Sequence, residues 1–172
     1  YAHEPRGLYS QMIFGESFEN CPDCGIGQKN IGGEWPNKIL TAGVTADIAL
    51  DATEAFNGGQ SQKIAFMSGK GQAGIAKRGL GNEGLVFVGG KPYEGYFFAK
   101  GNSSAKITVS IEDHTQSPVL VLASQTLSFG GGNWTQMKFD LTPSQSTTCN
   151  GIANADAKEK YGILCPVNNT YN

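Results

Sequence analysis

Alternation of apolar and polar side chains with a period of two residues is the feature that most constrains how this sequence can fold. Residues 106–111 and 136–141, within the segments 106–113 and 135–141, alternate without interruption, so each segment has one apolar face when its backbone is extended. The apolar positions are Ile107, Val109, Ile111, Met137, Phe139 and Leu141. This spacing predicts β-strands with one face directed towards a hydrophobic core.

Further strands are predicted where short apolar runs end in turn residues, of which the 24 glycines supply many. In the segment EWPNKIL, residues 34–40, Trp35-Pro36 is interpreted as an anchored turn and not as an element, and regular structure is expected to begin after this segment. About eight strands are expected in all. They lie within residues 45–50, 57–67, 73–81, 84–90, 93–99, 105–113, 117–129 and 133–143. This number and spacing predict an all-β fold, a jelly-roll β-sandwich.

Residues 117–129 leave two readings open. Val119, Val121 and Ala123 fall on one side of an extended chain, and Leu120 and Leu122 fall on the other. A strand buried on both faces and a strand that carries a β-bulge both fit this pattern.

The two ends of the chain differ from its middle in the spacing of their apolar residues. Leu8, Met12 and Ile13 have the spacing of one helical face, which predicts a short N-terminal helix or arm. The tail contains one helix-like stretch, residues 155–162, and is otherwise irregular. The expected division is an arm at 1–16, a jelly-roll sandwich at 17–148 and a C-terminal tail at 149–172.

Composition narrows the choice of partner and compartment. The net charge is −2 and the pI is near 5.7, so nucleic acid and anionic membrane are not expected partners. No charged-then-apolar leader opens the chain, and Tyr1 is interpreted as a mature or trimmed start. Three glycosylation acceptor patterns begin at Asn102, Asn133 and Asn168. Together with an even number of cysteines, they favour a secreted, extracellular protein.

The four cysteines are expected to form two disulfides, Cys21 with Cys24 and Cys149 with Cys165. The second bridge would tether the C-terminal tail. A redox or metal role for Cys21-Pro-Asp-Cys24 is the alternative, but a Gly-rich loop follows this pair where a thioredoxin-type pair would open a helix.

The opening GLYSQMIFGESFE and the motifs after it, in their order, resemble part of a known enzyme family. Trp35 follows Ser17-Phe18-Glu19, and then come NGGQSQKI, GIAKRGLG, KPYEGYFFAKG, ITVSIED, LASQTLSF and NWTQMKFDLTP. This order is similar to the carbohydrate-binding-like jelly-roll module inserted in eukaryotic-type α-L-arabinofuranosidases of glycoside hydrolase family 51. The family's Asn-Arg before Ser-Phe-Glu is replaced here by Phe14-Gly15-Glu16.

The resemblance implies sugar binding without catalysis. In that family the catalytic acid and the catalytic nucleophile are glutamates of a (β/α)₈ barrel. Such a barrel needs at least about 200 residues. A chain of 172 residues leaves no room for one beside a sandwich, so it is either a fragment of such a glycoside hydrolase or a separate protein that is not an enzyme. In the chain itself Glu16, Glu19, Glu112 and Asp113 read as single carboxylates, the last two as solubility-giving residues at a strand end. His3 and His114 are expected in surface loops.

Aromatic residues with polar neighbours are the candidate sugar-binding groups, because a sugar ring stacks on an aromatic face while its hydroxyls accept and donate hydrogen bonds. The candidate residues are Trp35, Tyr93, Tyr96 and Trp134, with Arg78 and Gln136 among the polar partners. Packing inside the fold is the competing interpretation, especially for the two tryptophans.

A structural calcium is considered as the one cofactor, with Glu19 and the chain around Asn57 as ligands, because calcium prefers oxygen donors. An ordinary Asn57-Gly58 turn explains the same residues. Two functions therefore follow from the sequence. One is a secreted β-sandwich module that engages polysaccharide, and the other is a glycosylated structural subunit that assembles with copies of itself through its terminal segments.

Overall fold

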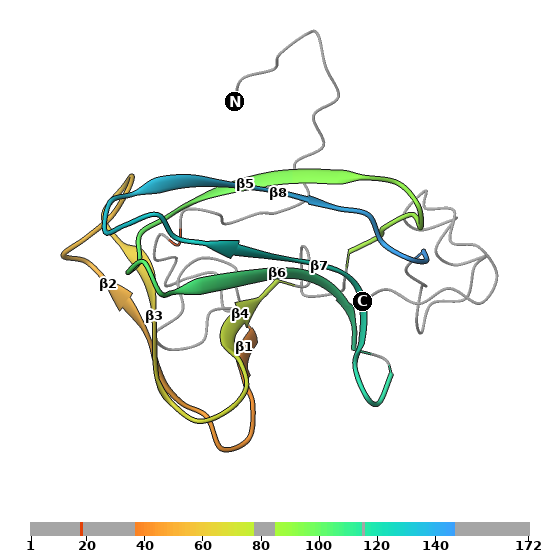
Figure 1. Cartoon of the computed structure of the whole chain (residues 1–172), viewed down its shortest axis with the longest axis horizontal. Coiled ribbons are helices and arrows are strands. Elements are labelled where there is room, and N and C mark those ends of the chain that lie inside the picture. The colour runs from red at the N-terminus through yellow and green to blue at the C-terminus, as the bar shows by residue number, and fades with distance from the viewer. Residues whose placement is uncertain (1–17, 19–36, 78–84, 115, 147–172) are drawn as a thin grey trace, which may run out of the picture. The chain divides into compact units, whose positions relative to one another are not determined.

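The structure of the protein is a computed structural model that describes residues 18, 37–77, 85–114 and 116–146 (Figure 1). These residues form eight strands and no helix, and every strand pair is antiparallel. The fold of the described part is therefore all-β, as the alternation predicted. The chain divides into two compact units, Tyr1–Asn82 and Glu83–Asn172, and each is described by itself.

The first unit contains one long bent hairpin. Its outgoing arm is made of β1 (Asn37–Leu40) and β2 (Thr45–Asp51), and its returning arm of β3 (Ser61–Ser68) and β4 (Ala73–Ala76). β2 pairs with β3 and β1 pairs with β4, so the hairpin continues past a bend between the two ladders.

Turn chemistry produces the bend. The Val44 N–H donates to the Thr41 carbonyl at 3.0 Å, and Gly43 supplies the positive φ of 81° that this turn requires. On the returning arm Gly69 has a φ of 106°, and a side chain there would collide with the backbone of Gly43. Thr41 and Gln72 exchange two hydrogen bonds across the bend, which hold the two arms together.

The second unit consists of two ribbons. β5 (Tyr93–Ala99) pairs with β8 (Thr135–Leu141), and β6 (Lys106–Asp113) pairs with β7 (Leu120–Ser128). In Figure 1 the β5–β8 ribbon lies over the β6–β7 ribbon with its strands running in a similar direction.

The core of the second unit lies between these ribbons. Ile111 from β6, Leu122 from β7 and Leu141 from β8 form one buried cluster. Partly buried side chains pack around it: Phe87, Val109, Ala123 and Phe139. Gln125 reaches from β7 to accept a hydrogen bond from the Asp140 N–H at 2.9 Å, so a polar contact joins the ribbons as well. The arrangement is sandwich-like, with two apolar faces packed against each other.

A β-bulge decides between the two readings of residues 117–129. Ile111 is paired with Ala123, and the next residue, Glu112, is paired with Val121, which leaves Leu122 as the extra residue of β7. Leu122 is buried, whereas Val121 is 50% exposed. The bulge is confirmed, and burial of this strand on both faces is wrong.

Two local predictions are also wrong. The segment 84–90 does not form a strand in its described part, residues 85–90. The rings of Phe87 and Tyr93 meet edge-on with their centroids 4.9 Å apart, and the Val88 N–H donates to the Tyr93 hydroxyl. Phe87 packs against the core without a backbone ladder, whereas Val86 and Val88 are about half exposed. Conversely, Asn37–Leu40 is a strand, because β4 pairs with it from far along the chain. The expected arm at 1–16 and tail at 149–172 lie outside the described residues.

Candidate functional site

The solvent-directed face of the β5–β8 ribbon is built from three cross-strand pairs. In the ladder register Glu94 is opposite Asp140, Tyr96 is opposite Lys138, and Phe98 is opposite Gln136. All six side chains are exposed, while the residues between them are buried or half-buried. We call these six residues the platform face.

Two aromatic rings stand next to each other on the platform face. Tyr96 is 64% exposed and Phe98 is 38% exposed. Their ring centroids are 6.2 Å apart, and their planes meet at 85°. Exposed aromatic carbon flanked by a lysine and a glutamine can stack a sugar ring and hydrogen-bond its hydroxyls.

Packing on the opposite face of the ribbon positions these rings. Alternation along β5 directs Gly95 and Phe97 inward, and the ring of Phe97 lies 6.2 Å from that of Phe139 on β8. A side chain at Gly95 would fall on the Phe139 ring, so the glycine leaves the space that this ring occupies. The platform face is therefore carried by paired strands and not by a loop.

The predicted aromatic residues are not gathered in one place. Tyr93 lies on the other side of β5 from Tyr96 and is half-buried, with its hydroxyl accepting the Val88 N–H at 2.8 Å. Trp134 is half-buried and directly precedes β8. Trp35 and Arg78 lie outside the described residues. Of the predicted candidates, Tyr96 and Gln136 are the two on the platform face.

The other four residues of the platform face were not among the predicted candidates: Glu94, Phe98, Lys138 and Asp140. A signal for Phe98 was present, since it follows Tyr96 by two residues and so shares its side of a strand. Lys138 could be recognised as the cross-strand neighbour of Tyr96 only when the register between β5 and β8 was known.

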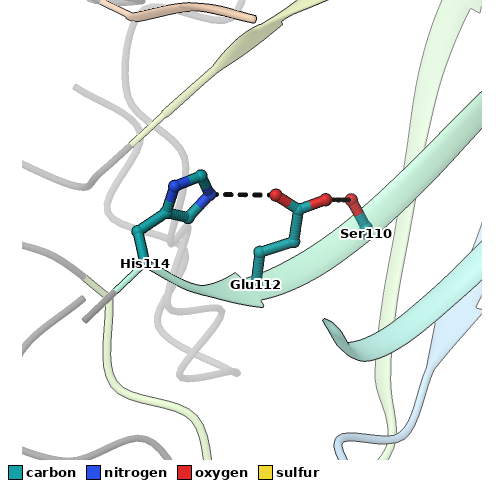
Figure 2. A network of polar contacts seen from close by, with 3 residues as sticks. All are labelled: Ser110, Glu112 and His114. Carbon is teal, nitrogen blue, oxygen red and sulfur yellow. Dashed lines mark hydrogen bonds and ion pairs between the residues drawn. The ribbon is translucent and has the colours of Figure 1, made fainter. Parts of the chain in front are cut away.

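A second polar group consists of Ser110 and Glu112, on one face of β6, and His114, the residue that follows the strand (Figure 2). The Ser110 hydroxyl donates to Glu112 Oε1 at 2.7 Å, and Glu112 Oε2 lies 2.9 Å from His114 Nε2. In a nucleophilic triad the histidine stands between the serine and the carboxylate. Here the carboxylate stands in the middle, so the histidine cannot take the proton of the serine.

The reading of Glu112 and Asp113 as solubility-giving surface carboxylates is therefore wrong. The side chain of Glu112 is only 19% exposed and is held by two partners, and Asp113 is 4% exposed. Both belong to the end of a strand that packs into the second unit, and a buried carboxylate contributes little to the solvated surface.

Two of the glycosylation acceptors lie in the described part of the chain, and both are exposed. Asn102 closes a turn, because its Oδ1 accepts hydrogen bonds from the N–H and the hydroxyl of Ser104 at 3.1 and 2.8 Å. Asn133 precedes β8, and its carbonyl accepts from the Thr135 hydroxyl. A glycan attached through an Asn nitrogen is compatible with both positions. Asn168 lies outside the described residues.

Of the two proposed calcium ligands, only Asn57 lies in the described residues. The Asn57 side chain is exposed and its Oδ1 accepts from the Gly58 N–H at 2.9 Å, as an ordinary turn requires. Within the ranges the structure describes, no three His, Cys, Asp or Glu residues form a group that could hold a metal. Glu19 and the four cysteines, Cys21, Cys24, Cys149 and Cys165, lie outside those ranges.

Hydrogen bonds displace the titration of the Asp51 carboxylate. The Thr53 hydroxyl and then the Thr53 N–H donate to it, and these bonds lower the pKa of Asp51 below its ordinary value. Because the ionised form is favoured in the folded protein, its contribution to stability is present at neutral pH and is lost as the pH falls through the lowered pKa. This contact closes the turn after β2 in the first unit, whereas the platform face belongs to the second unit.

Comparisons with family models, with curated proteins and with solved structures find no match to this chain. The part of the chain that the structure describes contains no helix long and apolar enough to cross a membrane. The described residues therefore define an all-β protein with sandwich-like packing, and the platform face is its candidate functional surface.

Proposed function

We propose that the protein is a secreted, non-catalytic carbohydrate-binding module of the jelly-roll type and that the platform face engages polysaccharide. The observation that carries the proposal is the exposed ring of Tyr96, with Phe98 beside it and Lys138 opposite it. Contact between such an exposed aromatic ring and water is unfavourable, and stacking on the apolar side of a sugar removes part of the ring surface from water.

Polar residues around the rings support the proposal. Gln136 has both donors and acceptors, Lys138 has three donors, and Glu94 and Asp140 have only acceptors when ionised. Sugar hydroxyls can act in both ways, so this mixture suits them. The resemblance to the family 51 module and the exposed acceptors Asn102 and Asn133 support an extracellular carbohydrate-binding protein independently of the platform face.

Replacing Tyr96 with alanine is expected to weaken polysaccharide binding about tenfold. Covering about 60 Å² of apolar ring surface at about 25 cal/mol per Å² contributes about 1.5 kcal/mol, which corresponds to a factor of about ten. Calorimetric titration with arabinan, arabinoxylan and β-glucan measures the affinity of the two forms.

Phe66→Ala is the matched control, since Phe66 is also a half-exposed aromatic residue on a strand but belongs to the first unit. It is expected to leave the affinity unchanged. Thermal unfolding of both variants shows whether each is folded. Absence of binding to all three polysaccharides by the unaltered protein would refute the proposed function, as would equal losses in the two variants.

A further inference from the structure

We infer that the platform face takes a single sugar that projects from a polysaccharide, at a branch or at a chain end, and not the flat side of a long chain. The inference rests on the proposed function and adds the class of ligand. It starts from the angle of 85° between the planes of Tyr96 and Phe98, whose centroids are 6.2 Å apart.

A sugar ring stacks with its plane nearly parallel to an aromatic ring, because its C–H groups then lie on the negative aromatic face. A flat, ribbon-like glycan presents successive sugars in nearly one plane and would need coplanar rings beneath it. Tyr96 and Phe98 are almost perpendicular, so they cannot both stack on such a ribbon. They form a corner in which one ring lies beneath a sugar and the other stands beside it.

The polar residues lie at the distance that one sugar spans. Lys138 and Gln136 are the direct cross-strand partners of Tyr96 and Phe98, and side chains opposite each other in an antiparallel pair have Cβ atoms about 4.5–5.5 Å apart. Hydroxyl groups at the rim of a sugar seated in the corner would therefore meet an ammonium and an amide. Both are suited to hydroxyl oxygens, since each can donate a hydrogen bond.

The backbone beneath the corner is already part of a paired ribbon. Tyr96 and Phe98 are two residues apart on β5, and every residue of β5 is paired with β8. Phe97, between them, packs inward beside Phe139. Because the strands fix the backbone positions of the two residues, only the rotation of their side chains has to be restricted on binding.

The test compares two probes with the same backbone, arabinoxylan and unsubstituted xylan, by titration of the full chain. We expect at least tenfold tighter binding of arabinoxylan. Phe98→Leu should reduce this preference at least threefold while binding remains measurable, and Phe98→Tyr, which keeps the ring, should preserve the preference.

The outcomes separate the inference from the function on which it rests. Equal affinity for the two xylans, or tighter binding of a linear β-glucan than of arabinoxylan, would overturn the corner but leave sugar binding in place. A preference that persists unchanged in a folded Phe98→Leu protein would also overturn it. Failure of the unaltered protein to bind any of these glycans, branched arabinan included, would remove the proposed function itself.

Discussion

Leu122→Ala is expected to lower the free energy of unfolding by about 2–5 kcal/mol, the range measured for buried leucines in well-packed cores. Leu122 is 4% exposed and belongs to the cluster with Ile111 and Leu141. Its removal leaves a cavity between the two ribbons, because the β-bulge that directs it inward also prevents a neighbouring side chain from replacing it.

The neighbouring residue provides the control. Val121 belongs to the same strand, is 50% exposed and points away from the core, so Val121→Ala is expected to change stability by less than about 1 kcal/mol. Urea unfolding followed by circular dichroism measures both variants. Similar losses at the two positions would show that the bulge is placed incorrectly.

Gly95→Ala is expected to destabilise the second unit by about 1–3 kcal/mol through overpacking. A methyl group at this position would overlap the ring of Phe139, its cross-strand partner on β8. The strand or the ring has to move, and either movement displaces Tyr96, the next residue on β5. We therefore expect this variant to bind polysaccharide more weakly as well, although the change lies on the opposite face from the sugar.

Gly74→Ala is the matched control for this prediction. Gly74 is also a strand residue, in β4, but no atom lies within 4 Å of the position that its Cβ would occupy. The added methyl group restricts the unfolded chain, so stability should stay the same or increase by up to about 1 kcal/mol. Thermal and urea unfolding of the two variants provide the comparison. An equal loss at Gly74 would mean that glycine flexibility, and not the Phe139 contact, explains the effect.

The sequence predicted well those parts of the fold in which alternation alone decides the outcome. β6 and β8 lie where the period of two residues placed them, and Met137 and Leu141 are buried as expected. Side chains on a strand must alternate between its faces, so a clean pattern in a strand of seven or eight residues has only one consistent reading.

Hydrophobicity without alternation was less informative. Residues 84–90 are apolar enough to be a strand, yet the described part of them has no ladder and packs through Phe87 instead. The opposite error occurred at Asn37–Leu40, a short segment that becomes a strand because β4 supplies a partner more than thirty residues away. Pairing over such a distance leaves no local signal.

The candidate site was predicted only in part, because the sequence shows residue types but not which strands pair. Tyr96 was identified from its residue type, and the spacing alone places Tyr93 on the opposite face of the strand, since the two residues are three apart. The polar half of the platform face depends on the register between β5 and β8, which are separated by two other strands. Register of this kind follows from tertiary packing and cannot be derived from either strand alone.

Mapping the bound sugar by NMR tests the central proposal most directly. Uniformly ¹⁵N-labelled protein is titrated with oligosaccharides of arabinoxylan, and the amide shifts of every assigned residue are followed. We expect saturable changes concentrated at residues 94–98 of β5 and 136–140 of β8, with β6, β7 and the first unit largely unaffected. Saturable changes that avoid these two segments, or no changes at any sugar concentration, would contradict the assignment of the platform face as a carbohydrate-binding site.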